Sequence, residues 1–279
     1  MKRIKRRIKW KNLFLLLFIL TCIIILITNT FNIIIWKINS NQTIKQINKI
    51  HNIIKIEEVK NTENIEIIET EKKIEKENPY WDYIKMNLIN VNFKELKEIN
   101  NETIGWIQVN GTNINYPFVQ TKDNDFYLTR SFDKTYNPSG WVFLDYRNNI
   151  DLDKNIILYA HSMKDKTMFG TLRNILKSDW LKNPNNYIIK LSTETENTLW
   201  QIFSIYHIPT TTDYLKTTFY TEEGFINFTN LLLKRSQYNF NTTLNKDDKI
   251  LTLSTCYNDT EKLAIHAKLI KREKKANNY

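Results

Sequence analysis

The longest apolar run of the chain lies near its start, from Leu13 to Trp36, and only a few Thr and Asn interrupt it. A helix of about 24 residues crosses a hydrocarbon layer of ~30 Å with room for tilt. No small-residue cleavage pattern accompanies the run, which favours an uncleaved membrane anchor over a removed signal peptide. Residues 1–12 carry seven Lys or Arg and no acid. This tail is expected to stay in the cytoplasm, with everything after Trp36 outside.

Residues 37–77 form a second, charged segment without Pro or Gly. Isoleucines recur at helical spacing between Ile44 and Ile54, and Glu alternates with Lys further on. The apolar spacing is too irregular for three good coiled-coil heptads. The pattern predicts a helical or partly disordered stalk that carries a domain away from the bilayer, with a binding element as the alternative.

Residues 78–279 read as a folded domain that opens with two helices. Asn78-Pro79 is a helix start, followed by an apolar face that extends to Leu88. A second helix is predicted to start at Asn92, where Glu95 stands at the spacing of a capping box.

From Trp106 onward the pattern changes to the alternation of β-strands. Asn110-Gly111 lies between two short alternating runs and predicts a hairpin with a type I′ turn. Further strands are predicted over residues 141–144, 155–160, 186–191, 199–207, 249–255 and 262–270, and helices over 167–176 and 221–237. Short strands with helices inserted in their loops indicate a mainly β fold, a closed or nearly closed barrel.

Composition and charge exclude several functions. The five Gly are scattered, whereas phosphate-binding loops and dinucleotide folds need several Gly close together. The basic tail explains much of the net charge of +10, and no basic–aromatic groove pattern suggests nucleic acid. Cys22 and Cys256 are too few for a disulfide scaffold. No residue pattern calls for a cofactor or a metal ion.

Cys256 is the candidate nucleophile, because it is the only thiol outside the apolar run and follows a predicted strand that ends at a polar loop. A buried small hydrophobe is the alternative interpretation. A thiol nucleophile needs a base or a cation nearby. His161 also follows a strand, which makes it a better partner than His51, His207 or His266. These residues lack the spacing of zinc ligands.

Lys262 is the first cation after Cys256, at the start of the last predicted strand. A short loop between antiparallel strands would bring Cys256 and Lys262 side by side, where positive charge helps acyl transfer. A solvated lysine at a strand end is the alternative.

The run Thr252–Cys256, with Tyr159–Met163 and Met168–Gly170 upstream, resembles a class B sortase. The similarity covers residues 80–271 and includes segments 93–100, 104–107, 124–128 and 140–147. It implies a closed eight-stranded sortase-type β-barrel with N-terminal helices, and the predicted helix 221–237 fits the helix that class B members carry in a late loop.

The resemblance also implies cysteine transpeptidation at the outer face of a Gram-positive membrane. Cys256 would attack the scissile carbonyl of a sorting motif, LPxTG-like or a class B variant, on a surface protein. An amine of a peptidoglycan precursor or a pilin lysine would resolve the thioester, with His161 as general acid and base. Matching positions place Asn124, Leu128, Tyr159 and Ser254 near the substrate groove.

The chain departs from the family at Lys262, where an Arg after a longer loop is usual. Lys supplies charge without the planar fork of Arg. Three explanations are open. Lys262 replaces the Arg, which is the explanation we favour. Alternatively, another Arg reaches the site (Arg147, Arg235 or Arg272), or the protein is a weak or specialised sortase. Two other functions stay open: a surface cysteine protease that uses water as acceptor, and an inactive surface-binding domain.

Overall fold

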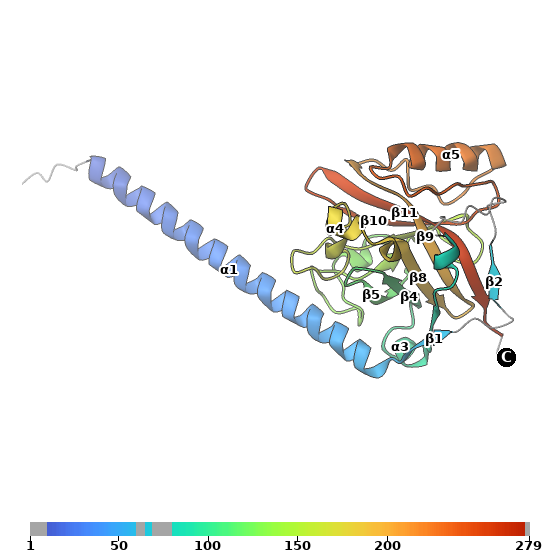
Figure 1. The fold of residues 1–279 in the computed structure, drawn as a ribbon. Coiled ribbons are helices and arrows are strands. Elements are labelled where there is room, and N and C mark those ends of the chain that lie inside the picture. Colours follow the sequence, from blue (N-terminus) through green and yellow to red (C-terminus); the bar gives the residue numbers. More distant parts are fainter. Residues whose placement is uncertain (1–9, 60–64, 69–79, 277–279) are drawn as a thin grey trace, which may run out of the picture. The chain divides into compact units, whose positions relative to one another are not determined.

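The computed structural model describes residues 10–59, 65–68 and 80–276 (Figure 1). The chain divides into two compact units, Met1–Gln42 and Thr43–Tyr279. The predicted tail 1–12 lies mostly outside the described residues.

The first unit contains most of α1 (Trp10–Ile53), a helix long and apolar enough to cross a membrane by length and composition. The predicted anchor 13–36 lies within this helix, and its large apolar side chains are exposed. Thr21 and Thr28 donate their hydroxyls to the carbonyl oxygens of Phe18 and Ile25, at 2.7 and 3.0 Å. These two hydroxyls are therefore satisfied by the helix itself, as a hydrocarbon environment would require.

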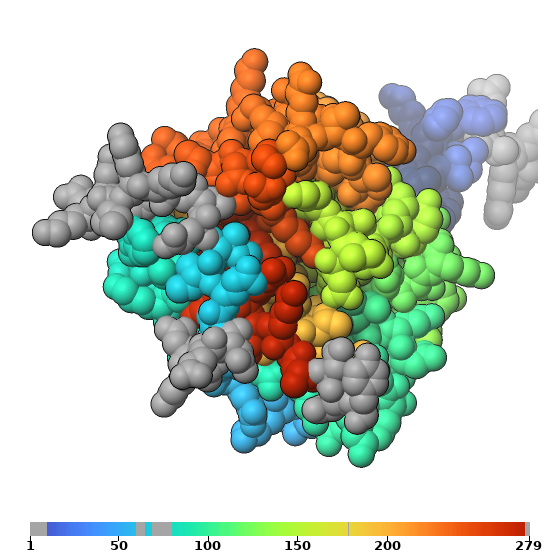
Figure 2. Space-filling model, turned by 90° about the vertical axis from the view of Figure 1, so that its right-hand side faces the viewer, coloured from blue at the N-terminus to red at the C-terminus, as the bar shows by residue number. Residues whose placement is uncertain are grey.

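The second unit begins inside the segment predicted as a stalk. Ile50 of α1 is buried, and the His51 ring meets the edge of Trp106 at 5.4 Å between centroids. β1 (Ile56–Val59) pairs with β3 (Leu88–Val91), and β2 (Ile65–Ile67) pairs with β11 (Glu261–Lys274). The compact unit thus extends further toward the N-terminus than the predicted boundary at residue 78. Figure 2 shows β2 beside the C-terminal part of β11.

The first of the two predicted N-terminal helices is shorter than expected. α2 spans Tyr80–Tyr83, and the chain then turns into β3 instead of continuing as a helix to Leu88. β3 forms because its apolar residues pair with β1 and are mostly buried. α3 spans Lys94–Ile99, and the Asn92 side chain accepts a hydrogen bond from the Lys94 N–H at 3.0 Å.

Among the described residues, eight strands close into a barrel in the order β10-β7-β6-β5-β4-β8-β9-β11, and β11 pairs back with β10. This confirms the predicted closed eight-stranded barrel. Besides β11, the strands are β4 (Thr103–Val109), β5 (Asn115–Val119), β6 (Phe143–Leu144), β7 (Asn155–Tyr159), β8 (Ile188–Thr193), β9 (Glu196–Pro209) and β10 (Ile250–Cys256). One apolar core includes Ile107, Leu191, Leu253 and Ile265.

The β4–β5 hairpin forms without the predicted type I′ turn. That turn needs positive φ at both central residues, but Gly111 has φ +68° and Asn110 is not in this region. The Thr112 hydroxyl closes a longer loop instead: it donates to the Val109 carbonyl at 2.8 Å and accepts from the Ile114 N–H at 3.1 Å.

The predicted late helix is present as α5 (Glu222–Arg235). Thr221 caps its N-terminus, and the Thr221 side chain accepts a hydrogen bond from the Gly224 N–H. Its buried residues Phe225, Phe228 and Leu232 pack in a second core with residues of β9, β10 and β11. α5 therefore covers one outer face of the barrel (Figure 1).

The predicted helix over 167–176 is a short 3₁₀ helix, η2 (Gly170–Asn174), because Met168 adopts positive φ and interrupts the regular helix. Three further short elements connect strands: η1 (Phe126–Leu128), α4 (Ser178–Leu181) and η3 (Pro184–Tyr187).

Candidate active site

The site forms where β7 and β10 end side by side. The two strands are parallel, and their last paired residues are Tyr159 and Ser254. His161 and Cys256 each lie two residues beyond this pair. Cys256 is the last residue of β10 and lies on the same face as Ser254, because side chains alternate along strands, and His161 follows the end of the neighbouring strand β7.

A side-chain bond ties the two strand ends together between these positions. The Thr255 hydroxyl donates to the Ala160 carbonyl at 2.7 Å, and both residues are buried. The residues directly before Cys256 and His161 are therefore held to each other, while Cys256 and His161 are themselves partly exposed.

Lys262 lies directly opposite Cys256 in the antiparallel register of β10 and β11. Its ammonium donates a hydrogen bond to Sγ at 3.1 Å. The expectation that a short loop brings these two residues side by side is met.

The three arginines considered as alternatives are engaged elsewhere. Arg147 pairs with Asp145 at 2.7 Å, Arg235 with Asp213 at 2.5 Å and Arg272 with Glu66 at 2.8 Å. Within the described part of the chain, Lys262 is the cation that contacts the sulfur.

The orientation of the His161 ring follows from its one hydrogen bond, between Nε2 and the Leu128 carbonyl at 2.8 Å. A carbonyl only accepts, so Nε2 carries the hydrogen and the neutral ring keeps the lone pair of Nδ1 for proton exchange.

Gly140 makes room for this arrangement. It has φ +61°, and a Cβ there would lie 2.5 Å from the Tyr127 carbonyl oxygen and 3.1 Å from Cδ2 of His161. A side chain at this position would collide with the loop that presents the Leu128 carbonyl to the imidazole.

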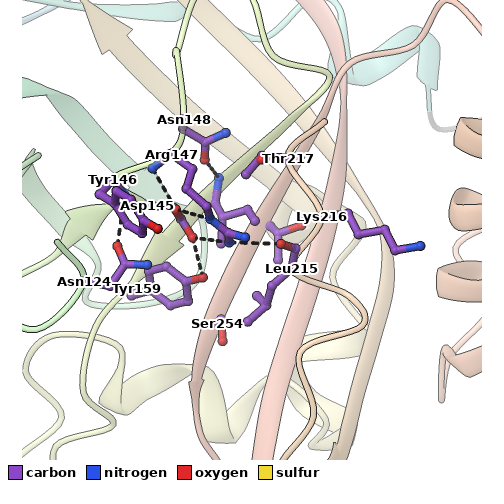
Figure 3. Close-up of polar contacts among 12 residues, drawn as sticks. Asn124, Asp145, Tyr146, Arg147, Asn148, Tyr159, Leu215, Lys216, Thr217 and Ser254 are labelled. Atoms are coloured by element: carbon purple, nitrogen blue, oxygen red, sulfur yellow. Dashed lines mark hydrogen bonds and ion pairs between the residues drawn. The ribbon is translucent and has the colours of Figure 1, made fainter. Parts of the chain in front are cut away.

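The four residues expected near the substrate groove hold the local fold with most of their polar groups; Figure 3 shows three of them, Asn124, Tyr159 and Ser254. The Tyr159 hydroxyl donates to Asp145 at 2.8 Å, and the hydroxyls of Ser254 and Tyr214 share a bond of 3.0 Å. Asn124 accepts from the Tyr146 N–H at 3.0 Å. Leu128 contributes its carbonyl to His161.

Asp145 is the centre of a polar network that the sequence reasoning missed. Its side chain is fully buried and accepts two hydrogen bonds from the Arg147 guanidinium, one from the Arg147 N–H and one from Tyr159 (Figure 3). Burial by itself would raise the pKa of Asp145, but these hydrogen bonds outweigh it and the pKa is lowered. The pKa of Tyr159 is raised, first by burial and then by the Asp145 charge. The only signal in the sequence is an acid and an Arg two residues apart directly after a buried strand.

This network also fixes the loop between β9 and α5. Arg147 donates to the Leu215 carbonyl at 3.1 Å (Figure 3). The Asn155 side chain donates to the Lys216 carbonyl at 2.8 Å. With the Tyr214–Ser254 bond, the loop is held against β7 and β10 close to Cys256, whose charge contributes, after burial, to the raised pKa of Tyr214.

Comparisons with known proteins agree with this fold and site. The model of the sortase domain family matches residues 107–270. Sortase B of Staphylococcus aureus is 34% identical over 184 residues, which cover 64% of this chain and 75% of that protein. Sortase B of Listeria monocytogenes is 36% identical over 170 residues, covering 61% and 68%. A crystal structure of sortase B from Bacillus anthracis superimposes with a TM-score of 0.60 at 37% identity, covering 64% of this chain and 84% of that one.

The chain belongs to the sortase family of cysteine transpeptidases, as a class B member. Its general activity is therefore the sorting of proteins to the cell wall by transpeptidation.

Proposed function

We propose that this protein is a single-pass membrane enzyme with a cytoplasmic N-terminus and an extracellular catalytic domain. It cleaves the C-terminal sorting motif of a surface protein, LPxTG-like or a class B variant, and transfers the new acyl group to an amine of a peptidoglycan precursor. The observation that carries the proposal is the Lys262 ammonium on the Cys256 sulfur, at the strand end that also presents His161.

In the first half-reaction, the Cys256 thiol gives its proton to Nδ1 of His161, and the thiolate Sγ attacks the scissile carbonyl carbon to form a tetrahedral intermediate. The C–N bond then breaks, His161 gives a proton to the leaving amine, and a thioester remains on Cys256. Lys262 supplies positive charge beside the sulfur and the developing oxyanion.

In the second half-reaction, the acceptor amine attacks the thioester and transfers a proton to Nδ1 of His161. The C–S bond breaks, an amide forms and the thiol is regenerated. A related sortase B has been solved in complex with triglycine, which makes this peptide the natural probe for the second step.

Asn124, Leu128, Tyr159 and Ser254 shape the groove that receives the peptide. Their polar groups mostly form hydrogen bonds with neighbouring loops. We therefore propose that these residues position the walls and floor of the groove and do not recognise the peptide through hydrogen bonds. The Asp145–Arg147 network supports the same walls from inside.

The test is a peptide cleavage assay with the full chain in detergent micelles, with and without triglycine, and with Cys256→Ala as the control. We expect cleavage of a sorting-motif peptide and diversion of the product to the triglycine amide. A product that stays entirely a free acid at saturating triglycine would indicate a protease that uses water. No cleavage and no adduct with any sorting-motif peptide would indicate a binding domain.

A further inference from the structure

The hairpin between β10 and β11 determines where the Lys262 amine stands. Residues 257–260 connect the strands, and Cys256 and Lys262 are the cross-strand pair that closes the hairpin at its base. Lys is a flexible point charge without the planar fork of Arg. Its contact with Sγ therefore depends on how firmly this base is held.

A contact on the opposite face of the sheet holds the base of the hairpin from behind. Tyr257 and Glu261 are sequence neighbours of Cys256 and Lys262, and side chains alternate along strands, so they project to the other side. His207 of β9 meets both of them. Its ring stacks on Tyr257 with centroids 4.5 Å apart and planes 11° apart, and its Nδ1 lies 3.0 Å from Oε1 of Glu261.

The loop itself is tied to the same carboxylate. The Asn258 side chain donates to Oε2 of Glu261 and accepts from the Thr260 and Glu261 N–H groups. The Thr210 N–H, just beyond β9, donates to the Thr260 carbonyl at 3.1 Å. Both sides of the hairpin base are thus attached to the end of β9.

These contacts also decide which group the Lys262 ammonium meets. The Glu261 carboxylate is the nearest acid in sequence, and its two oxygens are occupied by His207 and Asn258 on the far face. The His207 hydrogen bond is the main cause of the lowered pKa of Glu261, so this group stays ionised. A released carboxylate would compete with the sulfur for the ammonium.

We propose that His207, Tyr257 and Glu261 form a positioning clamp that holds the Lys262 amine on the Cys256 sulfur. The clamp residues touch neither the sulfur nor the peptide and act through the hairpin. This inference rests on the proposed function for its purpose, since the clamp serves a reactive Cys256.

The test measures alkylation of Cys256 by iodoacetamide at neutral pH in the full chain, with peptide mass mapping to separate it from Cys22. Glu261→Gln keeps the side-chain shape and removes the charge, whereas His207→Phe keeps a ring for the stack and removes Nδ1. Each variant is made alone and combined with Lys262→Gln. Lys97→Gln, which breaks a surface ion pair with Glu194 beyond the opposite end of β9, is the matched control.

We expect either clamp variant to lower the alkylation rate roughly three- to tenfold when Lys262 is present and to change it little with Lys262→Gln, because residues that act through one another are not additive. Lys97→Gln should leave the rate unchanged. An equal loss of alkylation rate with Lys262 and with Lys262→Gln, or no loss with either, would overturn the proposed clamp.

Alkylation needs no peptide, so the result is independent of the proposed function. If the effect of the clamp variants on alkylation depends on Lys262 but the protein cleaves no sorting-motif peptide, the clamp is supported and the proposed transpeptidase function is rejected. In the peptide assay, we expect the clamp variants to lower kcat with KM unchanged. A raised KM at constant kcat would place these residues in the groove instead and reject the clamp.

Discussion

Two cross-strand pairs on the same face of β10 and β11 differ in depth and therefore in chemistry. Cys256 and Lys262 stand at the end of the strands, and Thr252 and His266 stand two pairs further in on that face. The end pair is partly exposed, whereas both residues of the inner pair are fully buried.

The inner pair is a closed hydrogen-bond network. The Thr252 hydroxyl donates to Oδ1 of Asn155 at 2.8 Å and so accepts from Nδ1 of His266 at 2.9 Å. Nε2 of His266 then accepts from the Tyr206 hydroxyl at 3.0 Å. Every polar atom of a neutral imidazole is satisfied. Burial, with a smaller contribution from Arg235, lowers the pKa of His266 to about 3.

The end of the sheet leaves a different arrangement. His161 has one nitrogen bonded to a carbonyl and the other available, and the sulfur of Cys256 has one donor, Lys262. The second core beneath α5 includes Ile250 and Ala264 of β10 and β11. The same two strands thus carry a structural histidine where they are covered and the partly exposed pair of Cys256 and Lys262 at their end.

The largest expected effect separates the two histidines. His161→Ala should lower peptide turnover by roughly 10²–10⁴-fold, the usual contribution of general acid–base catalysis, with little change in thermal unfolding. His266→Ala should leave the folded fraction active but reduce the free energy of unfolding by about 2–4 kcal/mol, because it leaves Thr252 and Tyr206 without their partner and opens a cavity.

Kinetics of thioester formation and thermal melts of both variants check this contrast. A His266→Ala enzyme that folds normally yet loses turnover as strongly as His161→Ala would contradict the distinction between a structural and a catalytic histidine.

An intermediate effect is expected for the two lysines on this face of β11. Lys262→Ala should slow thioester formation roughly ten- to hundredfold, since hydrogen bonds to charged groups contribute about 1.5–3 kcal/mol. Lys268 is buried and donates to the Thr243 carbonyl at 2.8 Å. Lys268→Ala should therefore affect unfolding rather than the rate per folded molecule. Equal slowing by both substitutions, measured by quenched-flow mass spectrometry, would remove Lys262 from the mechanism.

The smallest expected effect is the pH dependence of stability that the inner pair imposes. The unfolded chain protonates His266 near its ordinary pKa of 6.5, but the folded chain does so only near 3. The contribution of His266 to the free energy of unfolding is complete above about pH 6.5 and declines as the pH falls from 6.5 toward 3. At pH 5 about 2 kcal/mol of it is lost. Denaturant melts of the wild type and of His266→Gln, which cannot titrate, should differ in this slope. If the free energy of unfolding of both proteins falls with pH in parallel, His266 is not the cause of this pH dependence.

The barrel was predictable, and the proposed catalytic residues could be selected, because each has a local signature. Alternating strands bounded by polar loops located β7, β10 and β11, and the strand ends singled out His161 and Cys256. Lys262 followed from the shortness of the hairpin, and the register confirms its place opposite Cys256.

The parts that were missed depend on contacts between distant segments. Ile50 and His51 read as a stalk, and only their packing on the domain shows that the helix end belongs to it. Gly140 near His161, and His207 beside Glu261, have no signature along the chain because their partners lie in distant segments.

The central claim, that the sulfur of residue 256 takes up the acyl group of a sorting peptide, has one direct measurement. The full chain is mixed with the peptide, quenched in acid and weighed intact. We predict an added mass equal to the acyl fragment on the wild type, its disappearance on adding triglycine, and none on Cys256→Ala. A wild-type protein that cleaves the peptide without ever carrying this mass, or a Cys256→Ala protein that still carries it, would contradict the account.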